Sequence, residues 1–251
     1  MMRIAAIIPA RYHSTRLPAK PLQKLGGKSI IEWVYNAVSA VVEDVVVATD
    51  DVRIVEEVER FGGRAIMTSE AHRSGTDRCA EALTKMGGDY DVVINVQGDE
   101  PFIRREHIEA LVGCFNNHET EIATLAKPMT EAEDATKIHN PNNVKVVTDL
   151  RGRALYFSRA AIPFQRDVEQ AEWAKRHTYL KHIGIYAFRT QTLKAVTALN
   201  TSALEQTEKL EQLRWLEHGY YISVAKTQYA TVGIDTPEDL QRAEEMLKEK
   251  E

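Results

Sequence analysis

Residues 3–22 read RIAAIIPARYHSTRLPAKPL, in which a short apolar segment leads directly into a long basic loop. Arg3–Ile8 has the β-rich, apolar composition of a buried strand. Residues 1–31 carry six Lys and Arg residues and no Asp or Glu, although the whole chain has a net charge of −5. Such a local excess of cations in an acidic protein indicates a pocket for a small anion. A general nucleic-acid or membrane surface would need a basic balance over a wider area.

Short apolar runs alternate with amphipathic stretches through the first half of the chain, which is typical of a parallel sheet wrapped by helices. One helix is predicted to open at the capping box Ser29-Ile-Ile-Glu32 and to end near Ala40, and another to run from Asp50 or Asp51 to about Phe61. The predicted strands are Arg3–Ile8, Asp44–Ala48, Arg64–Met67, Asp91–Val96 and Ile122–Ala126. We therefore expect an α/β fold with a doubly wound, mostly parallel sheet.

The pattern in the second half of the chain predicts antiparallel strand pairing and a smaller α+β lobe. A hairpin and a further strand are expected over Asn142–Thr148, Ala154–Phe157 and Lys181–Phe188. Helices over about 190–199 and 203–217 follow, then a strand over Tyr221–Ala225 and a terminal helix with Pro237 in its first turn.

Three regions are expected along the chain. Residues 1–127 form a doubly wound α/β core, residues 128–190 an inserted lobe, and residues 191–251 a C-terminal part that completes the core.

The composition excludes several classes of protein. Of the 251 residues 43% are hydrophobic and 27% charged, as in an ordinary globular protein. Cys79 and Cys114 lie far apart with no partner spacing, so neither a disulfide framework nor a zinc site is predicted, and a reducing compartment fits. The apolar run Ile4–Ile8 is too short for a secretory signal, and no run reaches the length of a membrane span.

The basic loop follows the first predicted strand, and open parallel sheets bind ligands at the carboxyl ends of their strands. Arg11, Arg16 and Lys20 can contact a triphosphate there, although a solvated basic loop would share the same composition. Leu25-Gly-Gly-Lys-Ser29 lacks the first glycine of a P-loop, and no dinucleotide fingerprint follows the strand. A nucleotide would therefore be held in another way.

Two aspartates are candidate metal ligands. In Val92-Val-Ile-Asn-Val-Gln-Gly-Asp-Glu-Pro101 a buried strand ends at Gln97, Gly98 would let a ligand approach the backbone, and Asp99 projects a carboxylate at the same edge. Asp235 again follows an apolar segment and a glycine. Carboxylates beside phosphates suit Mg²⁺. Asp99 could instead cap the helix near Arg104, and Asp235 could cap the terminal helix or serve both purposes.

Further polar residues could bind the rest of the ligands. Ser74-Gly-Thr-Asp-Arg78 precedes a predicted helix and could bind a base or ribose, although an ordinary helix cap explains it nearly as well. In the second half, Arg159, His182 and Tyr186 follow strand-like segments, and Glu205, Glu208 and Gln212 are predicted to share one helical face. These residues suit a hydroxyl-rich acid. Signature motifs of zinc enzymes, serine hydrolases and activated cysteines are missing from the sequence.

The chain closely resembles the 3-deoxy-manno-octulosonate cytidylyltransferases, or CMP-Kdo synthetases, of the sugar-activating nucleotidyltransferases. The resemblance runs nearly end to end and is carried by IPARYHSTRLPAKPL at 8–22, VATD at 47–50, SGTDR at 74–78, NVQGDEP at 95–101, NPNNVKVV at 140–147, ALYFSRAAIP at 154–163, KHIGIYAFR at 181–189, LEQLR at 210–214 and GIDTPEDL at 233–240. One departure is Ala19, where this family usually has glycine. The methyl group should be tolerated unless the backbone needs a positive φ.

The resemblance implies a nucleotide-diphospho-sugar transferase fold, and CTP and 3-deoxy-D-manno-octulosonate (Kdo) as substrates. It also implies CMP-Kdo and diphosphate as products, Mg²⁺ as cofactor, and a cytoplasmic homodimer that serves lipopolysaccharide synthesis. The lobe at 128–190 would bind sugar and form much of the dimer contact. No nucleic-acid or membrane partner is expected.

The same resemblance assigns roles to residues. The catalytic residues would be Arg16, Lys20, Asp99 and Asp235, and Asp99 and Asp235 would hold the metal. CTP would be bound by Pro9, Ala10, Arg11, Arg16, Lys20, Ser74, Gly75, Thr76, Asp77 and Gln97. Kdo would be bound by Arg159, His182, Tyr186, Glu205, Glu208, Glu211 and Gln212.

Two other functions stay open at this point. One is a cytidylyltransferase for another sugar acid, such as a sialic acid or 8-amino-Kdo, because pocket residues differ little in kind between such substrates. The other is a non-catalytic nucleotide-binding protein of the same fold. The presence of Asp99, Asp235, Arg16 and Lys20 argues against it, since binding alone does not need two metal carboxylates.

Overall fold

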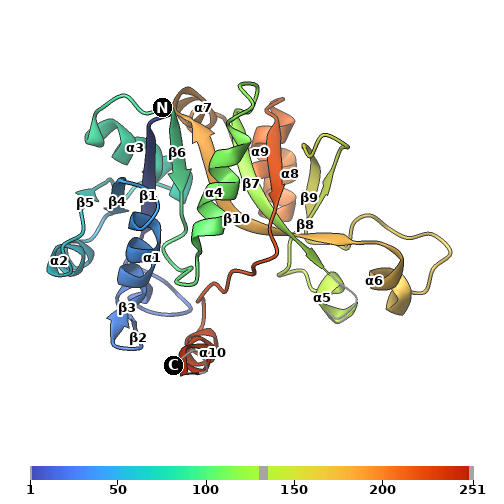
Figure 1. Cartoon of the computed structure of the whole chain (residues 1–251), viewed down its shortest axis with the longest axis horizontal. Coiled ribbons are helices and arrows are strands. Elements are labelled where there is room, and N and C mark those ends of the chain that lie inside the picture. The colour runs from blue at the N-terminus through green and yellow to red at the C-terminus, as the bar shows by residue number, and fades with distance from the viewer. Residues whose placement is uncertain (1, 130–134, 249–251) are drawn as a thin grey trace. The chain divides into compact units, whose positions relative to one another are not determined.

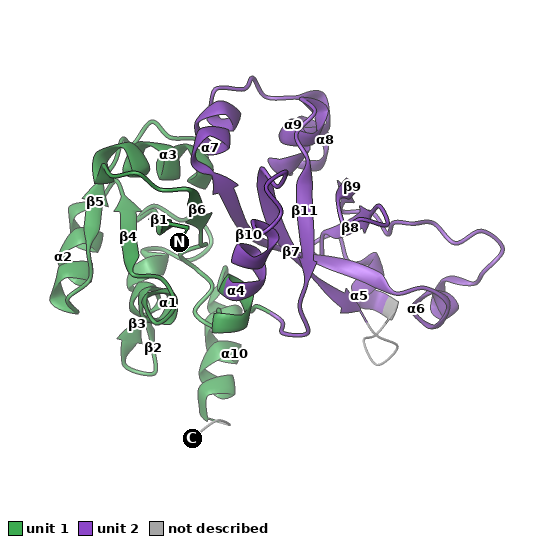
Figure 2. Ribbon diagram, turned by 45° about the horizontal axis from the view of Figure 1, so that its top comes forward, with its two compact units in different colours: residues 1–108, 231–251 green, residues 109–230 purple. Residues whose placement is uncertain are grey.

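The computed structural model describes residues 2–129 and 135–248, and the chain divides into two compact units. Unit 1 comprises Met1–Ile108 and Thr231–Glu251, and unit 2 comprises Glu109–Ala230 (Figure 2). Unit 2 is thus inserted in sequence between the two segments of unit 1. Within the described ranges, no helix has both the length and the apolar character needed to cross a membrane.

Unit 1 contains a parallel sheet in the order β6-β1-β4-β5 (Figure 1). Its strands are β1 (Ile4–Ala10), β4 (Asp44–Thr49), β5 (Ala65–Met67) and β6 (Val92–Asn95). Ile7 of β1 pairs with Val46 of β4 on one side and with Asn95 of β6 on the other. Because the strands are parallel, their carboxyl ends lie at one edge of the sheet. The basic loop after β1 and the Gln97–Asp99 turn after β6 therefore start from that edge.

Two helices of unit 1 begin at the caps that the sequence predicts. The Ser29 hydroxyl accepts a hydrogen bond from the Glu32 amide at 3.3 Å, and the Asp51 carboxylate accepts one from the Arg53 amide at 2.9 Å. The helices are α1 (Ile30–Ser39), α2 (Val52–Arg60), α3 (Gly75–Met86) and α10 (Pro237–Lys248), and α4 (Arg105–Cys114) crosses into unit 2. The short elements η1 (Lys20–Leu22), β2 (Lys24–Leu25) and β3 (Lys28–Ser29), which the sequence did not predict, follow the basic loop.

Unit 2 mixes parallel and antiparallel pairing. Strand β7 (Ile122–Met129) pairs antiparallel with β10 (Tyr179–Arg189) and parallel with β11 (Ile222–Lys226). The hairpin of β8 (Lys145–Thr148) and β9 (Ala154–Ser158) joins β10 through one residue pair. The helical elements are α5 (Ala135–His139), η2 (Gln170–Glu172), α6 (Trp173–Arg176), α7 (Thr190–Thr197), α8 (Ala203–Glu208) and α9 (Gln212–Glu217).

The predicted α/β class and the existence of the predicted strands are confirmed, but the structure differs from expectation in two places. The single helix expected over 203–217 is two helices, because Lys209 adopts a left-handed φ of 54° and ends α8. The compact units divide at 108/109 and 230/231, whereas divisions at 127/128 and 190/191 were expected. The physical reason is strand pairing: β7 pairs with both β10 and β11, so the three strands belong to one unit.

Candidate active site

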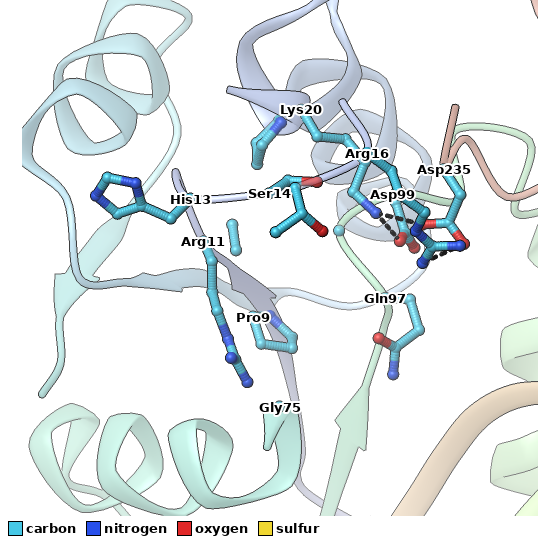
Figure 3. Close-up of a pocket in the computed structure, with 14 residues that line it drawn as sticks. Pro9, Arg11, His13, Ser14, Arg16, Lys20, Gly75, Gln97, Asp99 and Asp235 are labelled. Carbon is cyan, nitrogen blue, oxygen red and sulfur yellow. Dashed lines mark hydrogen bonds and ion pairs between the residues drawn. The ribbon is translucent and has the colours of Figure 1, made fainter. Parts of the chain in front are cut away.

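A pocket of about 530 Å³ lies in unit 1 beyond the ends of β1 and β6 (Figure 3). Its lining comes from the loop after β1, the turn after β6, the first residue of α3 and the segment before α10. The predicted catalytic residues Arg16, Lys20, Asp99 and Asp235 all line it. The predicted nucleotide-binding residues Pro9, Ala10, Arg11, Gly75 and Gln97 line it too. The structure therefore gathers nine predicted site residues in one pocket, at the edge where an open parallel sheet binds ligands.

Two contacts fix the basic loop over the pocket. Leu17 is 6% exposed and packs in a cluster with Leu25, Ile30, Ile234 and Ala243. Nearer the start of the loop, the Tyr12 ring lies 3.3 Å from the guanidinium of Arg53, at the beginning of α2. The loop is therefore anchored by an apolar contact and a cation–π contact, while the side chains of Arg11 and Arg16 stay exposed.

Ala19 meets the exception that was attached to the expected tolerance of its methyl group. It adopts φ 50° and ψ 35°, in the left-handed region, immediately before η1. This conformation costs a non-glycine residue about 1 kcal/mol because Cβ approaches the backbone. The backbone thus needs the positive φ that glycine adopts freely, and Ala19 stores a small strain beside Lys20.

Lys20 lies between the two aspartates (Figure 3). Its Nζ donates to Asp99 Oδ2 at 2.5 Å and to Asp235 Oδ1 at 2.8 Å. Burial lowers the pKa of the Lys20 ammonium, but the two carboxylates outweigh burial, so the pKa is raised above its ordinary value. The Ile234 amide donates to the Asp99 carbonyl at 2.9 Å, so a backbone contact holds the two aspartate segments together.

Neither aspartate serves as the helix cap that the sequence allowed. The Thr236 hydroxyl accepts from the Asp239 amide at 3.2 Å, and the Asp239 carboxylate accepts from the Thr236 amide at 3.0 Å, so Thr236 caps α10. The amide before α4, at Arg104, donates to His107 Nδ1. The carboxylates of Asp99 and Asp235 are thus available to the pocket.

Gly98 lines the pocket, and a contact within the chain also requires a glycine there. A Cβ at this position would lie 2.8 Å from the Pro9 carbonyl oxygen, closer than real Cβ atoms approach backbone. The glycine is required by the chain's own contact with the end of β1, and the predicted approach of a ligand to the backbone is not needed to explain it.

The donor set of the pocket fits Mg²⁺. Oxygens of Asp99 and Asp235 converge on one small cation, the Lys20 ammonium, so they can also converge on a metal ion. Over residues 2–129 and 135–248 there is no cluster of three or more His, Cys, Asp or Glu side chains that could hold a metal. Two carboxylates completed by phosphate oxygens and water are the ligands that Mg²⁺ prefers in nucleotide sites.

The two arginines of the loop point to different parts of the pocket. Arg16 is 65% exposed and its Nη2 lies 3.2 Å from Asp235 Oδ2. Arg11 points toward the start of α3, where its Nη2 donates to the Arg73 carbonyl at 3.0 Å (Figure 3). One guanidinium is therefore placed beside the carboxylates and the other near Gly75.

Residues 74–77 act mainly as a helix cap. The Ser74 hydroxyl accepts from the Asp77 amide and the Asp77 carboxylate accepts from the Ser74 amide, so both side chains belong to a capping box of α3. Thr76 is only 2% exposed. Gly75 is the member of this segment that lines the pocket.

In unit 2, Arg159 and Glu208 bind each other. The Arg159 amide donates to Glu208 Oε2 at 2.9 Å, and its Nε donates to the Glu208 carbonyl at 2.7 Å. The other carboxylate oxygen of Glu208 accepts from the Ser158 hydroxyl at 2.6 Å. These contacts fix the end of α8 against the end of β9.

His182 and Tyr186 lie on β10 with most of their surface buried. His182 Nε2 is 3.0 Å from the Thr124 hydroxyl, and burial lowers the pKa of His182 to about 3. Tyr186 is 7% exposed, and burial raises the pKa of its hydroxyl. Within the described residues, this hydroxyl has no hydrogen-bond partner. Buried polar atoms are normally paired, so an unpaired one indicates a ligand or a water molecule.

The acidic residues near α8 and α9 are largely used within the unit. The Glu205 carboxylate accepts from the Ser202 amide in a capping box, and Glu211 accepts from Arg214 at 2.7 Å. Gln212 differs, because it is 4% exposed and its amide nitrogen is unpaired in the part of the chain that the structure describes. The predicted common helical face of Glu205, Glu208 and Gln212 is wrong, since the first two lie on α8 and the third on α9.

Several residues of these sites escaped sequence reasoning. His13, Ser14 and Thr15 line the pocket; they belong to the loop that was expected to bind the nucleotide but were not named individually. Trp215 stands one helical turn after Gln212, contacts the Tyr186 ring at 5.0 Å, and leaves its buried indole nitrogen unpaired in the described chain. Tryptophan is mainly an apolar residue, so the sequence did not indicate that the indole N–H of Trp215 could bind a ligand.

Comparison with known proteins gives one consistent family. The cytidylyltransferase family model matches residues 5–227. A 3-deoxy-manno-octulosonate cytidylyltransferase from Bacteroides thetaiotaomicron is 56% identical over 98% of this chain and 99% of that protein. A protein of the same name from Phocaeicola vulgatus is 55% identical over 100% of this chain and 99% of that protein.

A solved structure agrees with the sequence relatives. CMP:2-keto-3-deoxy-manno-octonic acid synthetase, solved as a complex with CTP, is 41% identical to this chain and superposes with a TM-score of 0.90. The match covers 99% of this chain and 100% of that one. The chain therefore belongs to the cytidylyltransferases, and within them to the family of 3-deoxy-manno-octulosonate cytidylyltransferases.

Proposed function

We propose that this protein transfers CMP from CTP to Kdo, with formation of CMP-Kdo and release of diphosphate. The observation that carries the proposal is the pocket of unit 1, where Lys20 and Arg16 meet the paired carboxylates of Asp99 and Asp235. Family membership adds the substrates, because a relative of the same fold was solved with CTP. We further propose that the product supplies lipopolysaccharide synthesis.

The pocket residues would divide the nucleotide between them. Arg16 and Lys20 supply positive charge for the phosphates. The nucleoside would contact the side chains of Arg11 and Gln97 and pack against Pro9 and Gly75, which also line the pocket. Asp99 and Asp235 would hold Mg²⁺. When bound, Mg²⁺ neutralises charge that develops on the phosphates. Positioning and electrostatic stabilisation by these residues supply most of the acceleration in phosphoryl transfer.

The sugar acid is assigned to unit 2. Tyr186, Gln212 and Trp215 bring three buried, unpaired donors together, since the rings of Tyr186 and Trp215 are in contact and Gln212 lies one turn away on α9. These donors suit hydroxyl groups of a sugar. Arg159, Glu205, Glu208 and Glu211 already have partners within the unit, so they would shape this site as much as contact the ligand.

The chemical step is attack of the anomeric 2-hydroxyl of Kdo on the α-phosphorus of CTP, with diphosphate as leaving group. With its pKa lowered to about 3, His182 is neutral near pH 7. It therefore acts as a hydrogen-bond partner and not as a proton source.

We also propose a cytoplasmic homodimer. Unit 2 exposes large apolar side chains at Leu155 (61%), Phe164 (74%) and Tyr221 (58%), which a second copy could cover. Cys79 and Cys114 are both free thiols, as suits a reducing compartment. Sedimentation equilibrium tests the dimer: Phe164→Glu should shift the native protein toward monomer, and an unchanged mass would contradict a role of Phe164 in the dimer contact.

The decisive experiment measures diphosphate release from CTP and Mg²⁺ with Kdo, 8-amino-Kdo and a sialic acid. Release with Kdo alone, or far faster than with the others, supports the proposal. Faster release with another acid would identify that acid, and not Kdo, as the substrate. No release with any acid would contradict the enzymatic function. The matched reaction without Mg²⁺, in the presence of chelator, should be inactive if the metal assignment holds.

A further inference from the structure

The four charged side chains at the carboxylate end of the pocket form a neutral group. Lys20 and Arg16 contribute two positive charges, and Asp99 and Asp235 two negative charges. The two cations differ in exposure, since the Lys20 side chain is 16% exposed and that of Arg16 is 65% exposed. Lys20 is also the cation that contacts both carboxylates. It is therefore the internal counter-ion of the pair.

The position of the ammonium conflicts with that of a divalent cation. Lys20 Nζ lies 2.5 Å from Asp99 Oδ2 and 2.8 Å from Asp235 Oδ1. A magnesium ion needs carboxylate oxygens at roughly 2.0–2.1 Å and in octahedral order. Both cations cannot lie between the same two oxygens, so the lysine has to leave before a metal ion is shared by the pair.

The lysine side chain can make this move. Its ammonium is a point charge on a flexible four-carbon stem, and it exchanges one anionic partner for another without a fixed geometry. The loop that carries Lys20 also carries Arg11 and Arg16, so phosphates bound there would lie within reach of the same segment. The segments that carry the two aspartates, in contrast, are joined to each other by the backbone hydrogen bond from Ile234 to Asp99.

We propose that Lys20 closes the Asp99–Asp235 pair in the nucleotide-free protein, and that its transfer to the phosphates of a bound nucleotide opens the pair to a divalent cation. Metal and nucleotide then assist each other, because each is favoured by the displaced position of Lys20 and such coupling is reciprocal. This inference rests on the proposed function, since it assigns regulation to the same site.

The first test is a titration of nucleotide-free protein with Mn²⁺, followed by electron paramagnetic resonance. Lys20→Met removes the ammonium and keeps the length of the side chain. We expect it to bind Mn²⁺ about tenfold more tightly than the unaltered protein, within the usual range of coupling between sites. Lys24→Met is the matched control, because Lys24 pairs with Glu57 and is not among the residues that line the pocket. It should bind Mn²⁺ as the unaltered protein does.

A second variant locates the metal. In the double variant Lys20→Met/Asp99→Asn the gain in Mn²⁺ affinity should disappear. If it persists, the ion binds elsewhere and the inference is overturned. Equal or weaker Mn²⁺ binding by Lys20→Met, compared with the unaltered protein, overturns it as well. Should Lys20→Met not fold, Lys20→Gln keeps a donor for the carboxylates and takes its place.

Thermal unfolding gives an independent readout. Mn²⁺ should raise the Tm of Lys20→Met more than that of the unaltered protein, since the metal replaces the missing counter-ion. Equal shifts would argue against displacement. None of these measurements uses turnover. If the unaltered protein releases diphosphate but binds Mn²⁺ as tightly as Lys20→Met does, only this inference is contradicted. If no sugar acid gives diphosphate release, the proposed function is contradicted.

Discussion

Each unit contains a lysine whose ammonium contacts several oxygens, but the oxygens differ in kind. Lys20 in unit 1 contacts two carboxylates in a partly exposed pocket. Lys145 in unit 2 is 0% exposed and donates to the backbone carbonyls of Asn140 and Arg159, at 3.1 and 2.7 Å, and to that of Asn143. The carboxylates raise the pKa of Lys20, whereas burial lowers the pKa of Lys145 to about 8.

The two lysines differ in whether their ammonium groups can exchange one binding partner for another. Lys20 and its carboxylates can each find another ionic partner when a metal or phosphate enters. Lys145 joins the 140–143 loop to the end of β9, and its partners are neutral backbone carbonyls that cannot bind a metal or phosphate in its place. We therefore expect charge substitutions in the pocket to affect activity and the substitution of Lys145 to affect stability.

The largest expected effect is on turnover. Asp99→Asn keeps the size of the side chain but removes a charge from the pair, and should lower magnesium-dependent kcat by about 10²–10³-fold, as loss of a transition-state contact does elsewhere. Steady-state diphosphate release measures it. Asp44→Asn, outside the pocket lining, serves as control. Near-normal turnover in Asp99→Asn would refute the metal assignment.

Lys145→Met should act on stability instead. It removes the buried ammonium that donates to three backbone carbonyls, of which the Asn140 carbonyl keeps a hydrogen bond from the Asn143 amide, and should lower the free energy of unfolding by about 2–4 kcal/mol at pH 7. Urea denaturation followed by circular dichroism measures the loss. Lys194→Met, on the exposed side of α7, is a control that should change little. A loss below about 0.5 kcal/mol, the usual scale of surface substitutions, would contradict the structural role.

The lowered pKa of Lys145 also predicts a pH dependence with a definite sign. Between about pH 8 and 10.5 the unfolded chain binds this proton more strongly than the folded protein does. Its contribution to the free energy of unfolding therefore rises with pH across that window. The measurement compares the pH dependence of unfolding in the unaltered protein and in Lys145→Met. If the two show the same slope, Lys145 does not titrate in this range.

Tyr186→Phe tests whether unit 2 holds a ligand site. The hydroxyl has no partner in the described chain, so its removal should leave stability unchanged or slightly raised. If it binds the sugar acid, KM for Kdo should rise about tenfold, which corresponds to ~1.4 kcal/mol. KM for CTP should stay the same. A drop in stability with an unaltered KM would indicate that the hydroxyl is held by buried water.

The smallest expected effect is at Ala19. Ala19→Gly relieves the left-handed strain and should raise the free energy of unfolding by up to about 1 kcal/mol, less the entropy that glycine adds to the unfolded chain. Ala37→Gly, within α1, is the opposite control and should destabilise by about 1 kcal/mol. No gain at Ala19 would show that the loop adapts without strain.

Most of the pocket in unit 1 could be predicted from the sequence. The pocket was predictable because its residues follow strands directly, so that Lys20 and Asp99 had to lie near one edge of a parallel sheet. That Asp235 joins them depends on a backbone contact between distant segments, which spacing cannot reveal. The resemblance to a known family supplied that pairing.

Other features depend on conformation and contacts. The break at Lys209 lies in a stretch whose composition suits one continuous helix, and only its positive φ separates α8 from α9. Lys145 has the sequence context of a strand and gives no sign of burial. The unit boundaries follow from the pairing of β7 with β10 and β11, which periodicity does not encode.

The hydrogen bond from the Ile234 amide to the Asp99 carbonyl also sets an order of events in synthesis. Unit 2 lies between the two residues in the chain, so the ribosome makes the whole of it after Asp99 and before Asp235. A nascent chain can complete the parallel sheet of unit 1 long before its carboxylate pair exists. Contacts of such high sequence separation also form slowly. Catalytic competence is thus among the last properties that the growing polypeptide acquires.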